Sequence, residues 1–160
     1  MKRLWTIIVT TALILSGCAV KKEIGSSQAY VITVKNPSIA LSDTGFVNKG
    51  PHYTSVQIFA AGNVLFHLEM MGEYICLEGK CLDKVAFNRQ FFMQEHYAEL
   101  MQELLNKEPI YHGEKLKKTA LGFEQSLKLD SADIFYAVDH DSVLFKDTKN
   151  GVLFRLKPLP

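Results

Sequence analysis

Three cysteines offer the widest range of chemistry in this chain, because a thiolate can bind metal, attack a substrate or join a second cysteine. Cys76 and Cys81 are separated by four residues, and Cys18 lies far from both. A metal site is one interpretation of the C-x4-C pair, but no second pair and no histidine at ligand spacing follows it. Glu78-Gly79 suits a two-residue hairpin turn, which places the two cysteines opposite each other. The pattern therefore favours a Cys76–Cys81 disulfide over a metal site or a redox-active thiol.

The other side chains that could act in catalysis show no recognisable site. Asp139-His140-Asp141 is the one dense cluster, and hairpin tips commonly carry such residues. Serine nucleophile elbows, phosphate-binding P-loops and dinucleotide-binding glycine turns are absent from the sequence. Paired carboxylates of a hydrolase stay open as an alternative, but no spacing points to them, so we expect no catalytic residue and no metal. None of the five histidines lies in a metal-binding H-x-x-x-H or H-E-x-x-H arrangement: they are His52, His67, His96, His112 and His140.

The first residues have the layout of a secretory signal. Lys2 and Arg3 are followed by an apolar stretch over residues 4–15, which is too short to span a bilayer. The stretch ends in Leu15-Ser16-Gly17-Cys18, which resembles the lipobox of bacterial lipoproteins. The resemblance implies removal of residues 1–17 and attachment of a diacylglycerol and a further acyl chain to Cys18, with no other cofactor. An ordinary signal peptide with an incidental cysteine is the alternative.

Residues 18–28 are expected to form a lipidated, flexible tether, because they are polar and centred on Gly25-Ser26-Ser27. In lipoproteins of this kind, an Asp directly after the lipidated cysteine is the signal for retention in the inner membrane. Here Ala19 takes that position. The resemblance thus implies a lipid anchor in the outer membrane of a bacterial cell envelope, an oxidising setting that suits the disulfide.

The rest of the chain is long enough for one hydrophobic core, so we expect a single domain over residues 29–160. Lys2 and Arg3 account for two of the eighteen basic residues, and the signal holds none of the seventeen acidic residues. Sixteen basic residues then face seventeen acidic ones, a net charge near −1. This balance argues against a nucleic-acid partner, which would need a basic surface.

Strand signals occur on both sides of one helical stretch. The turn dipeptides Gly62-Asn63, Met71-Gly72 and Glu78-Gly79 predict a meander over residues 53–83. Taken literally, these turns place Phe59 opposite Phe66, Leu68 opposite Ile75, and Cys76 opposite Cys81.

A two-part helix is predicted to follow this meander. Asp83 suits an N-cap, and aromatic residues recur at helical spacing after it. A break near residues 93–96 precedes a second apolar stripe, which Pro109 ends. The alternation of apolar and polar residues that is typical of strands then resumes, with hairpins about His140-Asp141 and Asn150-Gly151. The order predicts an α+β fold, an antiparallel β-meander or open half-barrel covered by a two-part central helix.

A sheet covered by helices either packs solid or leaves an apolar cavity between the layers. Core packing is the commoner role for aromatic residues at helical spacing, whereas methionine adapts well to acyl chains. The candidate cavity-lining residues are Phe59, Phe66, Leu68, Met70, Phe87, Phe91, Phe92, Met93 and Met101.

The whole plan resembles the LolA/LolB family of lipoprotein-sorting proteins. The resemblance rests on the lipobox, the meander rich in Tyr and Phe, the two-part helix that ends in the LLNKEPI of residues 104–110, and the later hairpins. It implies an open antiparallel half-barrel, capped by helices, that holds lipoprotein acyl chains. The chain is short for that family, and the cysteine hairpin is not part of the family's pattern.

Two functions are therefore expected from the sequence, neither of them catalytic. The first is a lipid-anchored binding module for acyl chains or lipoproteins, and the alternative is a structural or assembly lipoprotein that binds another envelope protein. A continuous apolar cavity of at least about 300 Å³ would favour the first function. A solid core with an exposed apolar patch would favour the second.

Overall fold

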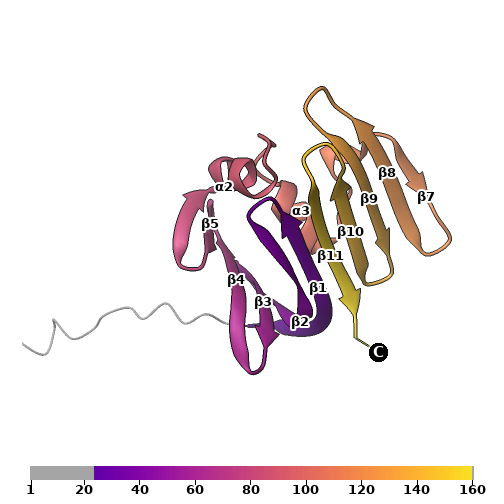
Figure 1. Cartoon of the computed structure of the whole chain (residues 1–160). Coiled ribbons are helices and arrows are strands. Elements are labelled where there is room, and N and C mark those ends of the chain that lie inside the picture. The colour runs from indigo at the N-terminus through magenta and orange to yellow at the C-terminus, as the bar shows by residue number, and fades with distance from the viewer. Residues whose placement is uncertain (1–23, 160) are drawn as a thin grey trace, which may run out of the picture.

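The computed structural model describes residues 24–159, so the expected signal, Cys18 and residues 19–23 lie outside the described residues. The described chain forms one antiparallel sheet of eleven strands with short helices in the connection between β6 and β7 (Figure 1). The predicted α+β fold of an open half-barrel with a two-part helix is confirmed. The first six strands are β1 (Ser26–Asn36), β2 (Ile39–Gly50), β3 (Tyr53–Ala60), β4 (Asn63–Met71), β5 (Tyr74–Leu77) and β6 (Lys80–Asp83).

The remaining elements follow the same alternation of hairpins after the helical connection. That connection contains α2 (Lys84–Phe91), α3 (Leu100–Asn106) and the 3-10 turn η2 (Tyr111–Gly113). The last five strands are β7 (Leu116–Lys118), β8 (Gly122–Lys128), β9 (Asp133–Asp139), β10 (Ser142–Asp147) and β11 (Val152–Pro158).

The first and last strands pair with each other in the middle of the sheet. The strand order is β6-β5-β4-β3-β2-β1-β11-β10-β9-β8-β7, which is two meanders joined by the antiparallel pair β1–β11. In this pair Ile32 lies opposite Leu156 and Val34 lies opposite Phe154. All four side chains are buried, so the seam between the meanders is also part of the core.

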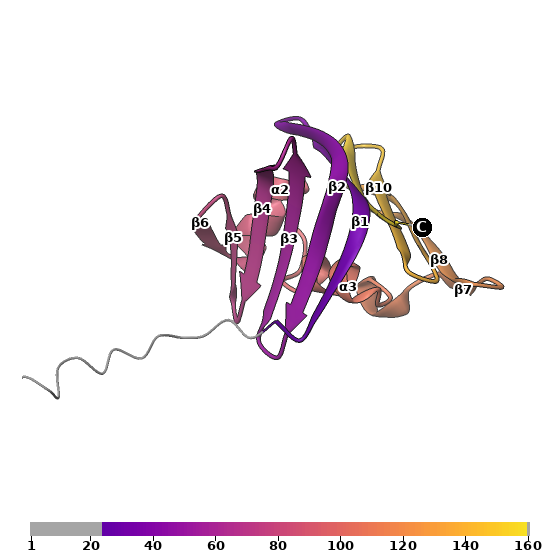
Figure 2. The ribbon, with the colours of Figure 1, turned by 90° about the horizontal axis from the view of Figure 1, so that it is seen from below.

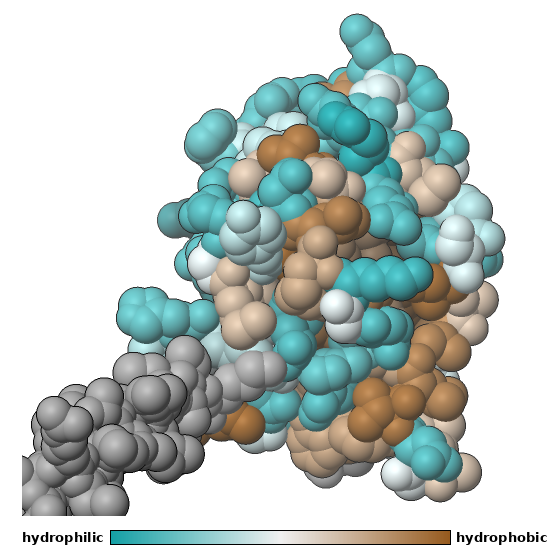
Figure 3. All heavy atoms as spheres, turned by 90° about the vertical axis from the view of Figure 1, so that its left-hand side faces the viewer, coloured by the Kyte–Doolittle hydropathy of each residue, from teal (hydrophilic) through white to brown (hydrophobic). Residues whose placement is uncertain are grey.

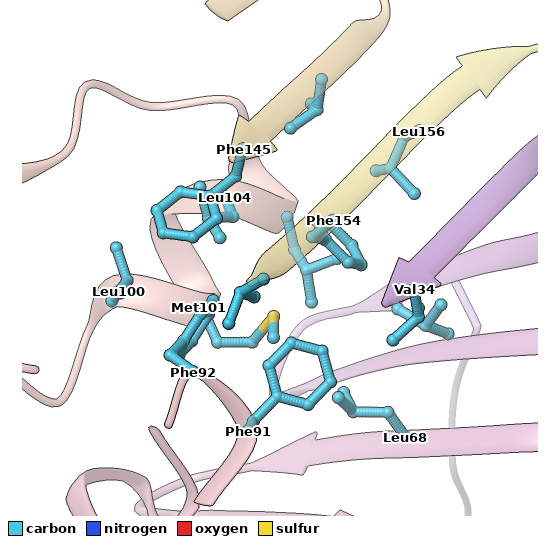
Figure 4. Close-up of a cluster of buried hydrophobic side chains, with 14 of the residues drawn as sticks. Val34, Leu68, Phe91, Phe92, Leu100, Met101, Leu104, Phe145, Phe154 and Leu156 are labelled. Carbon is cyan, nitrogen blue, oxygen red and sulfur yellow. The ribbon is translucent and has the colours of Figure 1, made fainter. Parts of the chain in front are cut away.

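The helices pack inside the curve of the sheet. Figure 2 shows the strands bent into an arch, with α3 lying between its two arms. Asp83 caps α2 as predicted, because its carboxylate accepts a hydrogen bond of 2.8 Å from the backbone N–H of Ala86. In Figure 4 the side chains of α2, α3 and the strands converge on one cluster. The apolar stripe of α3 contributes Leu100, Met101, Leu104 and Leu105, each at most 1% exposed.

The predicted tether is too long at its C-terminal end. Residues Ser26, Ser27 and Gln28 belong to β1, where they pair with Lys49, Asn48 and Val47. Their polar composition is typical of a linker, but β2 runs on to Gly50 and supplies hydrogen-bond partners for them. The domain therefore begins before residue 29.

The register of the β3–β4 hairpin differs by one residue from the prediction. The turn residues are Ala61 and Gly62, with φ of 48° and 80°, instead of Gly62-Asn63. Leu65 is then an extra residue between Val64 and Phe66, which forms a bulge. Phe66 consequently lies opposite Ile58, and Phe59 lies opposite Val64.

The next turn shifts in the same way. Met71 pairs with Tyr74, so the turn falls at Gly72-Glu73 and Leu68 lies opposite Leu77 instead of Ile75. The partner of Leu68 thus changes by two positions, from Ile75 to Leu77. Residues two positions apart in a strand point to the same face, so Leu68 and Ile75 still face the core.

Candidate functional site

A small apolar pocket opens at one end of the half-barrel, with a volume of about 190 Å³. It lies between the β1–β2 turn, the β5–β6 hairpin and α2. Figure 3 faces the side of the molecule that carries β5 and α2, and apolar atoms are visible there among polar ones. We call this site the rim pocket; its lining residues are Asn36, Ser38, Ile39, Leu77, Lys80, Leu82, Phe87, Gln90 and Phe91.

Asn36 joins two walls of the rim pocket. Its side-chain oxygen accepts hydrogen bonds from the backbone N–H groups of Ser38 and Ile39, both at 2.8 Å, and so shapes the β1–β2 turn. Its side-chain N–H donates to the carbonyl of Phe91 at the end of α2, at 2.9 Å. This buried amide therefore fixes the turn against the helix.

The β5–β6 hairpin forms the second wall, and the Cys76–Cys81 disulfide closes it. The predicted bond is present, with the two Cα atoms 3.9 Å apart. Glu78 and Gly79 form the turn with φ of 49° and 79°, and Leu77 pairs with Lys80 across it. The disulfide thus holds the strand pair that carries three lining residues, Leu77, Lys80 and Leu82.

Aromatic rings of α2 form the floor. Phe87 and Phe91 are stacked with ring centroids 5.3 Å apart, and Phe91 meets Phe92 edge to face at 5.0 Å. Phe92 in turn contacts Phe145 of β10 at 5.2 Å. The floor of the rim pocket is therefore the outer surface of the main core.

The rim of the pocket carries one cation and no carboxylate. Lys80 and Gln90 are exposed, and neither makes an ion pair or side-chain hydrogen bond with the described residues. The nearest acidic residues in the chain are already engaged. Glu78 accepts a hydrogen bond from the backbone N–H of His67 at 2.6 Å, and Asp83 caps α2.

The nine residues predicted to line a cavity fall into three groups. Phe87 and Phe91 line the rim pocket. Phe59 and Met93 lie outside the core, as described below. The other five are packed in the core cluster and are at most 7% exposed: Phe66, Leu68, Met70, Phe92 and Met101.

Phe59 is a wrong prediction because of the β3–β4 bulge. The shifted register places the neighbouring Ile58 in the core and turns Phe59 to the outer face of the sheet. There it packs edge to face on Phe46 of β2, with centroids 5.8 Å apart.

Met93 is also wrongly placed by the sequence. It follows the C-cap residue Phe92, has φ of 60°, and is 44% exposed. This left-handed residue turns the chain away from the axis of α2, so its side chain leaves the helical stripe.

Polar side chains hold the segment between α2 and α3 in place. The side-chain N–H of Asn88 donates to the carbonyls of Tyr97 and Ala98, at 2.6 and 3.3 Å. The hydroxyl of Tyr97 donates to Glu103 and accepts a hydrogen bond from the backbone N–H of Tyr111. Burial raises the pKa of Tyr97, and it also raises the pKa of Glu103.

His96 is the one buried histidine of this segment, with 4% exposure. Its Nδ1 lies 2.6 Å from the hydroxyl of Tyr111, while its Nε2 has no partner among the described residues. Burial lowers the pKa of His96 and raises the pKa of Tyr111 to about 12. Both shifts favour the neutral forms of this hydrogen-bonded pair, which lies under the connection between the helices.

The Asp139-His140-Asp141 cluster forms a turn between β9 and β10. Asp141 pairs with Lys107, and this hydrogen bond lowers the pKa of the Asp141 carboxyl. Within residues 24–159, no group of three or more His, Cys, Asp or Glu side chains is placed to hold a metal ion.

A second apolar feature lies at the end of the β3–β4 hairpin, which we call the hairpin-end patch. It consists of Phe46, Phe59, Val64 and Leu65. Phe46 is 43% exposed, Val64 is 45% exposed and Leu65 is 50% exposed. Apolar atoms gather at the lower edge of the face shown in Figure 3.

No protein-family model matches the chain, and no curated protein matches it. None of the helices within residues 24–159 has the length and apolar composition needed to cross a membrane.

Proposed function

We propose that this protein is a lipid-anchored lipoprotein of the bacterial envelope that binds acyl chains, either of lipids or of other lipoproteins, without catalysing a reaction. The rim pocket is the observation that carries this proposal, because its walls are apolar and its mouth is open to solvent. The lipobox-like Leu15-Ser16-Gly17-Cys18 supports the anchor, and Ala19 supports an outer-membrane location. The half-barrel with its helical cover is in keeping with the resemblance to the LolA/LolB family.

The size of the rim pocket limits what it can hold. Its volume of about 190 Å³ is below the roughly 300 Å³ expected from the sequence for a continuous acyl-chain cavity. The site therefore accepts the end segment of one chain, and each buried methylene contributes about 0.8 kcal/mol. A longer segment enters only if α2, a helix of eight residues, moves away from the sheet. Asn36 and the β5–β6 hairpin oppose that movement.

Photo-crosslinking in cells tests this proposal on the full chain. The photoreactive residue p-benzoylphenylalanine replaces Ser38, which is exposed at the mouth of the rim pocket. Ala40 is the matched control, because it is exposed two residues after Ser38, at the start of β2, and lies outside the lining. We expect intact-mass spectrometry to find lipid or lipoprotein adducts at position 38 and none at position 40. Equal labelling at both positions, or no acyl-bearing adduct at either, would contradict the proposal.

The hairpin-end patch together with the packed core is the combination that favours a second candidate function, the docking of another envelope protein. Clusters of exposed apolar residues commonly mark interaction surfaces. The same crosslinker at Leu65, which is 50% exposed, is expected to yield a single high-mass protein adduct if this candidate holds. Adducts at position 65 without acyl-bearing adducts at position 38 would replace the first proposal by the second.

A further inference from the structure

We infer that the rim pocket selects an anionic amphiphile, and that Lys80 binds the negatively charged group at the pocket mouth. This inference rests on the proposed function and adds the chemical class of the ligand. Its basis is the distribution of charge around the pocket, the position of Lys80 on a hairpin closed by a disulfide, and the polarity of the rim.

The charge of the lining is unbalanced. Lys80 is the only ionisable residue among the nine that line the pocket. Several lysines of the described chain have partners: Lys107 pairs with Asp141, Lys117 with Glu124, and Lys84 donates to Gln102. Other exposed lysines, such as Lys146, have none within that part of the chain, so what distinguishes Lys80 is its place in the lining of the pocket. Lys80 has no such partner among the described residues, so its ammonium group is free to meet an anion.

The disulfide gives Lys80 a defined place relative to the apolar lining. Lys80 pairs with Leu77 beside the turn, and Cys81, the next residue, is bonded to Cys76. Leu82, two residues after Lys80, also lines the pocket. Because residues two apart in a strand share a face, the cation and the apolar wall point toward the same site. An amphiphile bound there would place its chain against Leu82 and Phe87 and its polar end near Lys80.

The other rim residues add hydrogen-bond donors. Ser38 and Gln90 are exposed at the mouth, and both side chains can donate to an oxyanion. The carboxylate of a fatty acid and the phosphate of an anionic phospholipid share the required chemistry, an oxyanion at the end of an acyl chain. A neutral alcohol or a cationic amine of the same chain length would lack the attraction to Lys80.

Photoactivatable diazirine probes with one common chain can measure this selectivity on the full chain in a mild detergent. The probes are a fatty acid, the corresponding fatty alcohol and the fatty amine, together with lysophosphatidylglycerol and lysophosphatidylcholine. The readout is the ratio of labelling between probes at the pocket peptides, so competition by the detergent affects all probes alike. The variants are Lys80→Gln, Lys80→Glu and the matched control Lys146→Gln, since Lys146 is exposed on β10 outside the lining.

We expect the fatty acid to label the pocket about fivefold more than the alcohol, the upper range for a solvent-exposed charge pair. Lys80→Gln should bring that ratio close to one, Lys80→Glu should favour the amine, and Lys146→Gln should leave the ratio unchanged. Preference for lysophosphatidylglycerol over lysophosphatidylcholine would assign the anion to phospholipids, and preference for the fatty acid alone would assign it to free fatty acids.

Two outcomes separate the inference from the function on which it rests. Equal labelling by acid, alcohol and amine that Lys80 variants do not change would overturn the anionic selectivity and leave acyl binding standing. Absence of pocket labelling by every probe would overturn both. Thermal unfolding of each variant confirms that the compared proteins are folded.

Discussion

His96 shows how a single buried side chain ties stability to pH. Its ring lies between Phe92, edge to face at 5.4 Å, and the hydroxyl of Tyr111, with the charge of Asp147 nearby. Burial lowers the pKa of His96 in the folded protein, and the attraction of Asp147 opposes this only in part. The folded state therefore keeps this histidine neutral at a pH where the unfolded chain already binds a proton.

The stability of the protein should consequently decrease as the pH falls through the ordinary histidine pKa of about 6.5. The unfolded state takes up a proton there that the folded state does not, so the free energy of unfolding falls toward lower pH. Urea unfolding between pH ~7.5 and pH ~5 should show this slope in the wild type and a flatter one in His96→Gln. His52→Gln is the control, because His52 is exposed and should leave the slope unchanged. Equal slopes in all three proteins would contradict the role of His96.

Asn36 illustrates what a sequence leaves open at the level of one residue. Asn36-Pro37 marks the end of a strand, and that much follows from local turn chemistry. The hydrogen bond from Asn36 to the carbonyl of Phe91 joins residues 55 positions apart. Only the tertiary fold brings them together, so no local pattern identifies Asn36 as part of a pocket.

At the level of elements, the sequence predicts the register of the β5–β6 hairpin correctly but not that of the β3–β4 hairpin. Glu78-Gly79 occupies the turn as its residue types require, which fixes the Cys76–Cys81 register. In the β3–β4 hairpin, Ala61 adopts positive φ, and the bulge at Leu65 restores the core register afterwards. Alanine gives no signal for that conformation, so the sequence favoured Gly62-Asn63 and placed Phe59 on the wrong face.

In β2, too, the local residue types predict the wrong backbone conformation. Residues 42–45 (SDTG) suggest a turn, yet β2 continues through them as one strand of twelve residues. These residues pair with β1, and Gly45 also pairs with β3. Pairing with neighbouring strands outweighs the weak local preference for a turn.

The disulfide should stabilise the β5–β6 hairpin far more than the whole sheet. Five positions separate the two cysteines, so a loop-entropy estimate gives about 2 kcal/mol for the bond. The double variant Cys76→Ser/Cys81→Ser should lower the free energy needed to open the β5–β6 hairpin by about that much. Hydrogen exchange should become faster in β5 and β6 and stay unchanged in β10, with Ser126→Ala at an exposed position of β8 as a surface control. Faster exchange across all strands would contradict this local role.

At the scale of the whole molecule, the order of elements was accessible from the sequence, but the order of strands in the sheet was not. Turn signals and the Asp83 cap divide the chain into strands, helices and strands. The β1–β11 pair depends on contacts between Ile32 and Leu156 that no local spacing reveals. Whether side chains fill the space between the sheet and the helices or leave a pocket depends on packing across the layers, and the sequence alone does not determine that packing.

Removal of β11 should therefore unfold the protein. A chain that ends at residue 151 loses the strand that pairs with both β1 and β10 and the buried side chains Val152, Phe154 and Leu156. Far-ultraviolet circular dichroism should show no cooperative thermal transition for this variant. A chain that ends at residue 158 is the control and should unfold like the wild type. A cooperative transition in the shorter chain would show that the two meanders fold independently.

The seam between β1 and β11 also determines when the molecule can become native. Most strand pairs join neighbours in sequence, so hairpins can form as soon as their residues leave the ribosome. The seam joins Tyr30 to Pro158, which makes it the contact of greatest sequence separation in the sheet. Closing so long a loop is slow, and it requires a nearly complete chain. Until then each meander exposes its half of the core, so chaperone protection during synthesis matters most for this last step.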